Sequence, residues 1–307
     1  MRIVFFGTPL FAVASLQALV QSRFAVAGVV TQPDKPQGRS RSQLIAPPVK
    51  VAAQSQGLLV LQPVRPVGDV FTASLRRLEP DLGVVVAYGH ILRPEVLSIP
   101  TRGMINVHAS LLPRYRGAAP IQHAILQGET ETGISIMQME EGLDSGPILH
   151  HLATPIAADE TAGMLSGRLS ELGAGALVEV LSLLSAGAAP SQPQDHTRAT
   201  YAPKLDRDVA RLDWQDDAAL LSRQIRAFDP APGAWTTLNG SALKLFGARA
   251  ATGSGEPGEV IEASDQLVIG TGRGAIAVTE VQPAGKTRLG VDAWVRGRGI
   301  TTGQRLV

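Results

Sequence analysis

Two polar side chains sit in the apolar segment Met104–His108, just before a loop that contains proline, glycine and two arginines. Successive side chains of a strand point to opposite faces, so Asn106 and His108 share one face. An amide donates a hydrogen bond without changing charge, and an imidazole, with an unperturbed pKa of about 6.5, handles protons near neutral pH. The pair is therefore a candidate reaction centre. The spacing fits equally well with a strand end whose polar residues only cap the loop.

The bulk composition describes a folded protein with more than one domain. The chain has 307 residues, of which 44% are hydrophobic and 18% charged, enough to bury a sizeable core. No apolar run reaches the length of a membrane span, and we expect no signal peptide at the start. The lack of cysteine excludes disulfides and thiolate metal sites and fits a cytoplasmic location. A net charge of +1 means that any nucleic acid must be bound by local patches.

The elements that must position the pair alternate between strands and helices. Apolar strands are expected at residues 2–6, 25–31 and 82–87, with a helix after the first one that Thr8 could cap. Strands that are apolar along their whole length indicate a parallel sheet covered on both faces. We therefore predict a Rossmann-like, doubly wound, mostly parallel α/β sheet, which binds ligands at the carboxyl ends of its strands.

The first turn of this sheet lacks the glycines of a dinucleotide site. It reads Gly7-Thr8-Pro9, and no phosphate-binding loop of the Gly-x-x-x-x-Gly-Lys-Ser/Thr type occurs in the chain. The predicted fold therefore does not imply NAD or ATP.

The second half of the chain predicts a further domain. Residues 132–140 alternate as a strand exposed on one face, and residues 161–184 form a long amphipathic helix. A helix at 214–228 and strands at 234–238, 242–248, 258–263, 266–270 and 275–281 indicate a small β-barrel of the oligonucleotide-binding (OB) type. We predict a catalytic domain at 1–188, a linker at 189–207 rich in Ala, Pro, Ser and Gln, and an OB-like domain at 208–307.

Several motifs together resemble the methionyl-tRNA formyltransferases, members of the 10-formyltetrahydrofolate-dependent formyltransferases. They are Phe-Phe-Gly-Thr-Pro up to Pro9, Thr-Gln-Pro-Asp-Lys-Pro up to Pro36, the segment from Ile105 to Gln122, the strand after Thr132, and Gly-Leu-Asp-Ser-Gly up to Gly146. The resemblance covers nearly the whole chain. It implies transfer of a formyl group from 10-formyltetrahydrofolate to the free amine of methionyl-initiator tRNA for translation initiation.

The resemblance implies catalytic roles for Asn106, His108 and Asp144. Asn106 would donate to the oxyanion of the tetrahedral intermediate, and His108 would handle the proton. Asp144, distant in sequence, would orient His108. Taken singly, a histidine on an apolar strand is usually a core residue, and an aspartate between glycines is usually a turn residue.

The remaining site residues also follow from the resemblance. The folate would lie between two segments, which consist of Ala87, Tyr88, Gly89, His90, Ile91, Leu92 and of Ser110, Leu111, Leu112, Pro113. The tRNA would meet the basic residues Lys35, Arg39, Arg41, Lys50, Lys286 and Arg288, with Arg39 entering the acceptor end. Residues 208–307 hold eleven basic and eleven acidic residues, so that domain is not basic overall. Arg114 and Arg116 could steer the RNA end or brace the loop.

We expect no metal and no nucleotide cofactor, because formylfolate is already activated and the pair His150-His151 fits no standard metal spacing. We expect a cytoplasmic monomer without membrane contact. Two alternatives stay open. The same chemistry could serve a small amine or water as acceptor, or the chain could be a non-catalytic RNA-binding module with a transferase fold.

Overall fold

The computed structural model describes residues 1–37 and 43–307, which form two compact units. The N-terminal unit contains residues 1–120, 132–154 and 166–203, and the C-terminal unit contains residues 121–131, 155–165 and 204–307. The loop residues Arg39 and Arg41 lie outside the described residues.

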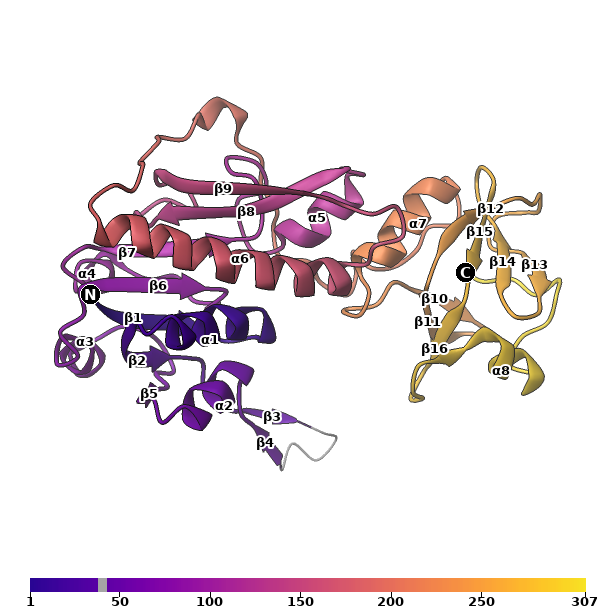
Figure 1. Cartoon of the computed structure of the whole chain (residues 1–307). Helices are drawn as coiled ribbons and strands as arrows, with labels where there is room; N and C mark the ends of the chain where they lie inside the picture. Colours follow the sequence, from indigo (N-terminus) through magenta and orange to yellow (C-terminus); the bar gives the residue numbers. More distant parts are fainter. Residues whose placement is uncertain (38–42) are drawn as a thin grey trace. The chain divides into compact units, whose positions relative to one another are not determined.

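The centre of the N-terminal unit is a sheet, which has seven strands in the part of the chain that the structure describes (Figure 1). Its strands are β1 (Arg2–Gly7), β2 (Ala25–Val30), β5 (Val60–Leu61), β6 (Leu82–Val86), β7 (Met104–His108), β8 (Glu131–Gln138) and β9 (Ile148–Pro155). The order is β5-β2-β1-β6-β7-β8-β9, with parallel pairing from β5 to β7 and β8 antiparallel to β7. The prediction of a mostly parallel, doubly wound α/β sheet is confirmed.

The strand order reverses at β1. The chain runs from β1 outward through β2 to β5, then returns to the other side of β1 as β6 and continues to β7. Because parallel strands end at one edge, the loops that follow β1, β2, β6 and β7 share that edge. Asn106 and His108 are thus delivered to the edge where an open sheet of this kind binds ligands.

Helices cover both faces of the sheet. The helices that precede β7 are α1 (Val13–Gln21), α2 (Pro48–Ser55), α3 (Asp69–Arg76) and α4 (Pro94–Leu97), and α6 (Ala162–Ser185) comes later in the chain. Phe71 of α3 and Val96 of α4 pack with Phe6, Val85 and Met104 on one face. On the opposite face, a Cβ on Gly173 of α6 would lie 2.9 Å from Val107 Cγ1, so this helix fits closely against β7. No helix in the described ranges is both long and apolar enough to cross a membrane.

Two local expectations are wrong. Strand β8 was expected to expose one face, but Thr132 through Met137 are all buried, because α6 covers Ile134 on one face and Leu112 packs on Met137 on the other. Thr8 does not cap the first helix, whose preceding 3-10 turn, Leu10–Ala12, begins without a side-chain cap. Its hydroxyl instead donates to the carbonyl of Tyr88 at 2.9 Å, which ties the end of β1 to the end of β6.

The C-terminal unit contains two antiparallel four-stranded sheets in its described segments. One has the order β10-β11-β16-β17 and the other β12-β15-β14-β13. The strands are β10 (Trp235–Leu238), β11 (Ser241–Phe246), β12 (Arg249–Ala251), β13 (Val260–Ala263), β14 (Leu267–Gly270), β15 (Ala275–Val278), β16 (Glu280–Pro283) and β17 (Leu289–Gly290). The helices α5 (Pro120–Leu126), α7 (Ala218–Ala227) and α8 (Val291–Arg296) complete it, Pro120 alone lying in the N-terminal unit.

The two sheets share long bent strands. β11 continues into β12 through Gly247, and β15 continues into β16 through Thr279, so the paired strands pass together from one sheet to the other. Gly247 has φ 64°, and a Cβ there would lie 2.1 Å from Thr279 Oγ1. Glycine is therefore required at this corner. The predicted small C-terminal β domain is thus confirmed and is antiparallel, with eight strands in its described segments in place of the five expected.

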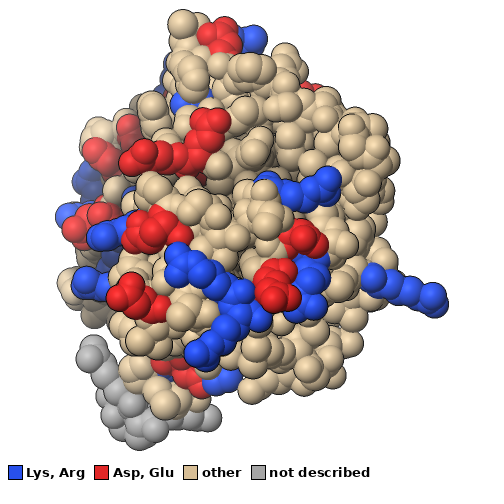
Figure 2. Space-filling view, turned by 90° about the vertical axis from the view of Figure 1, so that its left-hand side faces the viewer, with Lys and Arg blue, Asp and Glu red and all other residues tan. Residues whose placement is uncertain are grey.

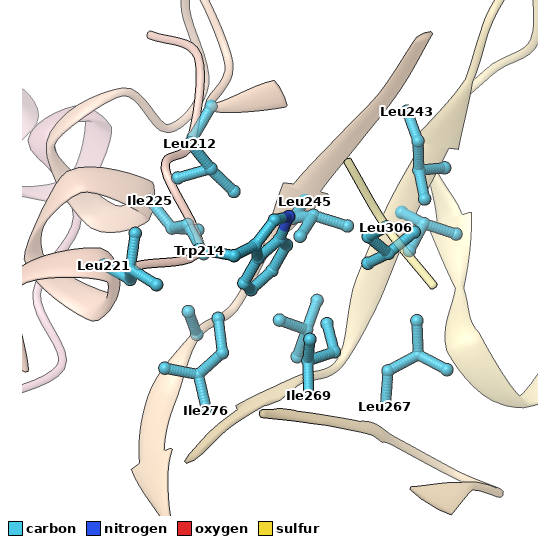
Figure 3. Packing of buried hydrophobic residues seen from close by; sticks show 14 of the residues in the cluster. Leu212, Trp214, Leu221, Ile225, Leu243, Leu245, Leu267, Ile269, Ile276 and Leu306 are labelled. Carbon is cyan, nitrogen blue, oxygen red and sulfur yellow. The ribbon is translucent and has the colours of Figure 1, made fainter. Parts of the chain in front are cut away.

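One hydrophobic core joins α7 to both sheets, with Trp214 in its middle (Figure 3). The predicted helix at 214–228 begins only at Ala218, where Asp217 caps it by accepting from Leu220 N at 2.8 Å. Trp214 lies before the helix, and its indole Nε1 donates to Thr236 Oγ1 at 3.0 Å while the ring fills the core. The tryptophan is a core residue of the β domain and not part of a helix face.

Candidate active site

Strand β7 sets the direction of the candidate catalytic side chains. Val107 faces α6, so alternation turns Met104, Asn106 and His108 to the other face. Asn106 pairs with Val85 of β6 on one side and with Met137 of β8 on the other. Both residues therefore stand on a central strand that is fixed by neighbours on each side.

His108 is buried and has oxygen partners at both ring nitrogens. Its side chain is 6% exposed. Nε2 lies 2.9 Å from the carbonyl oxygen of Tyr115, which can only accept, so this nitrogen carries the hydrogen. Nδ1 lies 3.7 Å from Oδ2 of Asp144, within ion-pair reach but longer than a hydrogen bond. The structure thus brings together two residues that are distant in the sequence.

The backbone around Asp144 is in a conformation that few residues adopt. Asp144 has φ 47°, and its Oδ2 accepts a hydrogen bond of 2.8 Å from the backbone N–H of Gly117. Gly117 has φ 115°, which is open only to glycine, and a Cβ there would lie 2.8 Å from the carbonyl oxygen of Ala202. The loop after β7 is therefore shaped so that its backbone can meet the Asp144 carboxylate.

The side-chain amide of Asn106 is available to bind a ligand. The residue is half-buried, and within residues 1–37 and 43–307 its side-chain amide has no hydrogen-bond partner. An amide NH₂ beside His108 at the ligand edge of a sheet can donate to a developing negative charge without any internal bond being broken first.

The first predicted folate segment divides into buried and exposed residues. Tyr88 and Leu92 are buried, whereas Ile91 is 86% exposed. The carbonyl of Tyr88 accepts from Thr8 Oγ1 and from Gln32 Nε2 at 3.0 Å, which fixes this loop to the ends of β1 and β2. Burial raises the pKa of Tyr88 to about 12, so its hydroxyl stays neutral and its ring acts as packing against Phe6.

The second predicted folate segment is held by a serine of β8. Ser135 Oγ donates to the carbonyl of Ser110 at 2.6 Å and accepts from the N–H of Leu112 at 3.0 Å. Leu112 is buried in a small cluster with Met137 and Ile148, while Leu111 and Pro113 are half-buried. Sequence reasoning missed Ser135, which is simply one polar residue in an apolar strand.

The basic residues predicted to contact tRNA differ in whether their charge is exposed or paired with an acidic residue. Lys35 is exposed at the start of β3 (Lys35–Gln37), which pairs with β4 (Gln43–Ile45). The ammonium of Lys50 lies 2.7 Å from Oδ2 of Asp34, and that carboxylate also accepts from Gln62. Hydrogen bonds from Gln62 and then Lys50 lower the pKa of Asp34, so the ion pair persists at neutral pH. Figure 2 shows one face of the molecule, on which Lys and Arg lie intermixed with Asp and Glu.

Arg288 of the C-terminal unit is occupied by acidic partners. Its guanidinium bonds both carboxylate oxygens of buried Asp229, at 2.8 and 3.1 Å, and Oε2 of Glu280 at 2.5 Å. Its Cζ also lies 4.1 Å from the centre of the Phe246 ring. Lys286, by contrast, is exposed. The two residues that the sequence assigned to one basic patch therefore stand in different environments.

The variant Arg288→Ala should destabilise the C-terminal unit by roughly 2–3 kcal/mol. Removing one partner of a buried ion pair typically costs about 3–5 kcal/mol, and Arg288 is itself partly exposed. Lys286→Ala is the matched control and should leave the thermal midpoint unchanged. Thermal unfolding of both variants measures this, and equal midpoints would show that the Asp229 pair contributes nothing to stability.

The structure assigns Arg116 to bracing and brings in an unforeseen glutamine. Arg116 is 4% exposed, and its Nη2 donates to Gln194 Oε1 at 2.6 Å. Arg114 is exposed beside the Tyr115 ring. Gln194 lies in the predicted linker, but residues 189–203 belong to the N-terminal unit by their contacts. No periodicity or motif in that stretch could have indicated a role for it.

Comparison with known protein families identifies the class of enzyme to which this fold and this site belong. A family profile described as "Formyl transferase" matches residues 1–181, and "Formyl transferase, C-terminal domain" matches residues 204–299. The chain therefore belongs to the formyl transferase family.

Within this family, the most similar proteins that we compared share one activity. The methionyl-tRNA formyltransferase of Syntrophus aciditrophicus is 46% identical over 304 residues, covering 98% of this chain and 97% of the relative. That of Pseudomonas paraeruginosa is 50% identical over 288 residues, covering 93% of each. The resemblance to the methionyl-tRNA formyltransferases is thus confirmed. HypX from Aquifex aeolicus, solved in complex with tetrahydrofolic acid, has a TM-score of 0.68 at 22% identity, over 97% of this chain and 47% of that one, and supports the fold alone.

Proposed function

We propose that this chain transfers the formyl group of 10-formyltetrahydrofolate to the free amine of methionyl-initiator tRNA, giving N-formylmethionyl-tRNA. Membership of the formyl transferase family and the near full-length identity with methionyl-tRNA formyltransferases support this function. The observation that carries the mechanism is the meeting of a free amide, Asn106, with the His108–Asp144 pair at the ligand edge of the sheet.

In the proposed mechanism the amine nitrogen of the methionyl group attacks the formyl carbon. A carbon–nitrogen bond forms, and the carbonyl electrons move to oxygen as a tetrahedral oxyanion, to which Asn106 donates a hydrogen bond. The oxyanion then collapses, the bond between the formyl carbon and N10 of the folate breaks, and the amine loses a proton while N10 gains one. His108 shares a strand face with Asn106 and has the Asp144 carboxylate beside its ring, so we assign the proton transfer to it.

The role proposed for Asp144 is to hold the ring of His108. Its carboxylate has two neighbours, the N–H of Gly117 and Nδ1 of His108, and it lies on the opposite side of the ring from the Tyr115 carbonyl. An imidazole held from both ends keeps one orientation, so it does not have to be reoriented when the reaction occurs.

We propose that the folate lies along the two loops that follow β6 and β7. Ala87 to Leu92 follow β6, and Ser110 to Pro113 follow β7, so both begin at the edge that carries Asn106. The exposed side chain of Ile91 offers apolar surface, and the loops are fixed in advance by Thr8, Gln32 and Ser135. HypX binds tetrahydrofolic acid on the same fold.

We propose that residues 1–188 carry the chemistry and residues 208–307 help to bind the tRNA, joined by residues 189–207. The basic residues assigned to tRNA are Lys35, Arg39, Arg41, Lys50, Lys286 and Arg288. Among the four that the structure describes, Lys35 and Lys286 are exposed. No metal or nucleotide is needed for this reaction, because the donor is already activated. We further propose that the enzyme acts as a monomer in the cytoplasm, where initiator tRNA is used.

The function is tested by measuring formyl transfer to methionylated initiator tRNA, methionylated elongator tRNA and small amines such as an amino-sugar nucleotide. We expect a much higher kcat/KM with the initiator tRNA, and a rate that falls steeply as salt is raised, because basic residues contact phosphates. Activity with small amines alone would assign the chain a different acceptor. Failure to bind formylfolate in calorimetry would favour the non-catalytic RNA-binding alternative.

A further inference from the structure

Gln194 connects the two backbone segments that hold His108 and Asp144. Its Nε2 donates to the carbonyl of Asp144 at 2.9 Å and to the carbonyl of Gly146 at 2.7 Å. Its Oε1 accepts from Arg116, through Nη2 at 2.6 Å and Nε at 3.2 Å. The residue is 6% exposed, and the bonds to Arg116 and to the Gly146 carbonyl are buried, while the bond to the Asp144 carbonyl is partly buried. Both donor hydrogens and the acceptor oxygen of the amide are therefore used.

The Asp144 turn has few other attachments. Residues 140–143 are exposed, and Leu143 is 57% exposed although it is apolar. Asp144 itself has the left-handed φ of 47°, which aspartate tolerates better than most residues but which is still less favourable than the right-handed region. The two carbonyl bonds from Gln194 are thus well placed to enforce the conformation that aims the carboxylate at His108.

Arg116 provides the other anchor of this bridge. It follows Tyr115, whose carbonyl meets His108 Nε2, and it precedes Gly117, whose N–H meets Asp144. Its buried guanidinium also has Nη2 at 3.1 Å from Nδ1 of His196. The loop with Tyr115 and Gly117 therefore contacts both His108 and Asp144. The Gln194 amide links this loop, through Arg116, to the turn that contains Asp144.

We propose that Gln194 is a positioning residue, which fixes Asp144 against His108 and thereby keeps the imidazole aligned for proton transfer. This inference rests on the proposed function. A hydrogen-bonding residue outside the reacting atoms changes the rate through geometry, and a displacement of about 1 Å can lower the rate by about 10²-fold.

A role limited to holding the chain in place does not fit the neighbouring bonds. The segment around Gln194 is already fixed by its backbone, through paired bonds between Gln192 and Ile148 at 2.8 and 2.9 Å. Further along, Arg116 N donates to Thr200 O at 2.9 Å, and Ala202 N donates to Arg116 O at 2.7 Å. These bonds do not involve the Gln194 side chain, so they persist in its variants and preserve the fold.

The test compares Gln194→Met with wild type in formyl transfer to charged initiator tRNA. Methionine has a similar length but makes none of the four bonds. We expect kcat to fall by about 10²-fold, with the KM values for folate and tRNA unchanged, since the buried Gln194 side chain bonds only to Arg116 and the Asp144 turn. Gln192→Met is the matched control, because Gln192 lies on the same segment with an exposed side chain, and it should behave as wild type. Should Gln194→Met not accumulate as folded protein, Gln194→Glu keeps the Arg116 contact, loses the donated bonds and carries the same expectation.

A double-mutant cycle separates positioning from general damage. In an Asp144→Asn background, Gln194→Met should cause little further loss of kcat, because two residues that act through one path are not additive. An unchanged kcat in the single variant, or an equal loss in both backgrounds, would overturn the positioning role. A wild-type chain that formylates no charged tRNA would instead refute the proposed function, which the wild-type arm reveals on its own.

Discussion

Replacing His108 by alanine lowers the kcat of formyl transfer by about 10²–10⁴-fold, the usual contribution of a general acid–base group. The variant keeps Asn106 and Asp144 but has no group that can move a proton between the attacking amine and the leaving folate nitrogen. Single-turnover transfer from 10-formyltetrahydrofolate to methionyl-initiator tRNA measures the loss. Folate binding should persist, because His108 is buried at 6% exposure and the two loops proposed to bind folate are held by other residues.

His151→Ala is the control for this result. His151 lies on β9, and its loss removes an imidazole from the same unit without touching the site. It should formylate at the wild-type rate. A His108→Ala enzyme that turns over normally while its circular dichroism is unchanged would remove His108 from the mechanism and leave it as a core residue.

Replacing Asn106 by alanine lowers kcat by about 10²–10³-fold, the effect of deleting one oxyanion donor. The amide has no internal partner among the described residues, so its removal breaks no bond of the folded protein and should hardly change the thermal midpoint. A large loss of rate with unchanged stability is the signature of a group used mainly in the transition state. Steady-state kinetics with thermal unfolding of the same samples provides both quantities.

The isosteric variant Asn106→Asp makes the test stricter. It preserves size and shape but places a carboxylate where the oxyanion forms, so its rate should be no higher than that of Asn106→Ala. An aspartate variant that retains wild-type activity would show that the donor at this position is not needed. The oxyanion would then have to be stabilised by a backbone N–H of one of the adjoining loops.

The sequence alone was sufficient for the sheet and for the strand that carries the candidate pair. Strands β1, β6 and β7 are short, mostly apolar and bounded by turn residues, and such runs indicate strands of a sheet that is covered on both faces. Because side chains alternate along a strand, the two-residue spacing of Asn106 and His108 also places them on one face of β7. The role of Asp144 was available only through the family motif, because nothing in a glycine-rich turn announces its spatial partner.

Other features depend on contacts between distant parts of the chain. The full burial of β8 is decided by the helix α6 and the loop after β7 that cover its two faces, which its own alternating pattern does not reveal. Arg288 looks like part of a basic patch until Asp229, from far along the chain, takes up its charge. A sequence records charge and spacing along the chain, while the partner of a charged group depends on the fold.

Gln194 is the clearest case of this division. By itself the sequence determines the fold class, the common face of the candidate pair on β7 and the family, since these are written in local patterns and motifs. Only the tertiary structure places an undistinguished glutamine between Arg116 and the carbonyls of Asp144 and Gly146. The physical reason is that amide hydrogen bonds act over about 3 Å in space, whatever the separation along the chain.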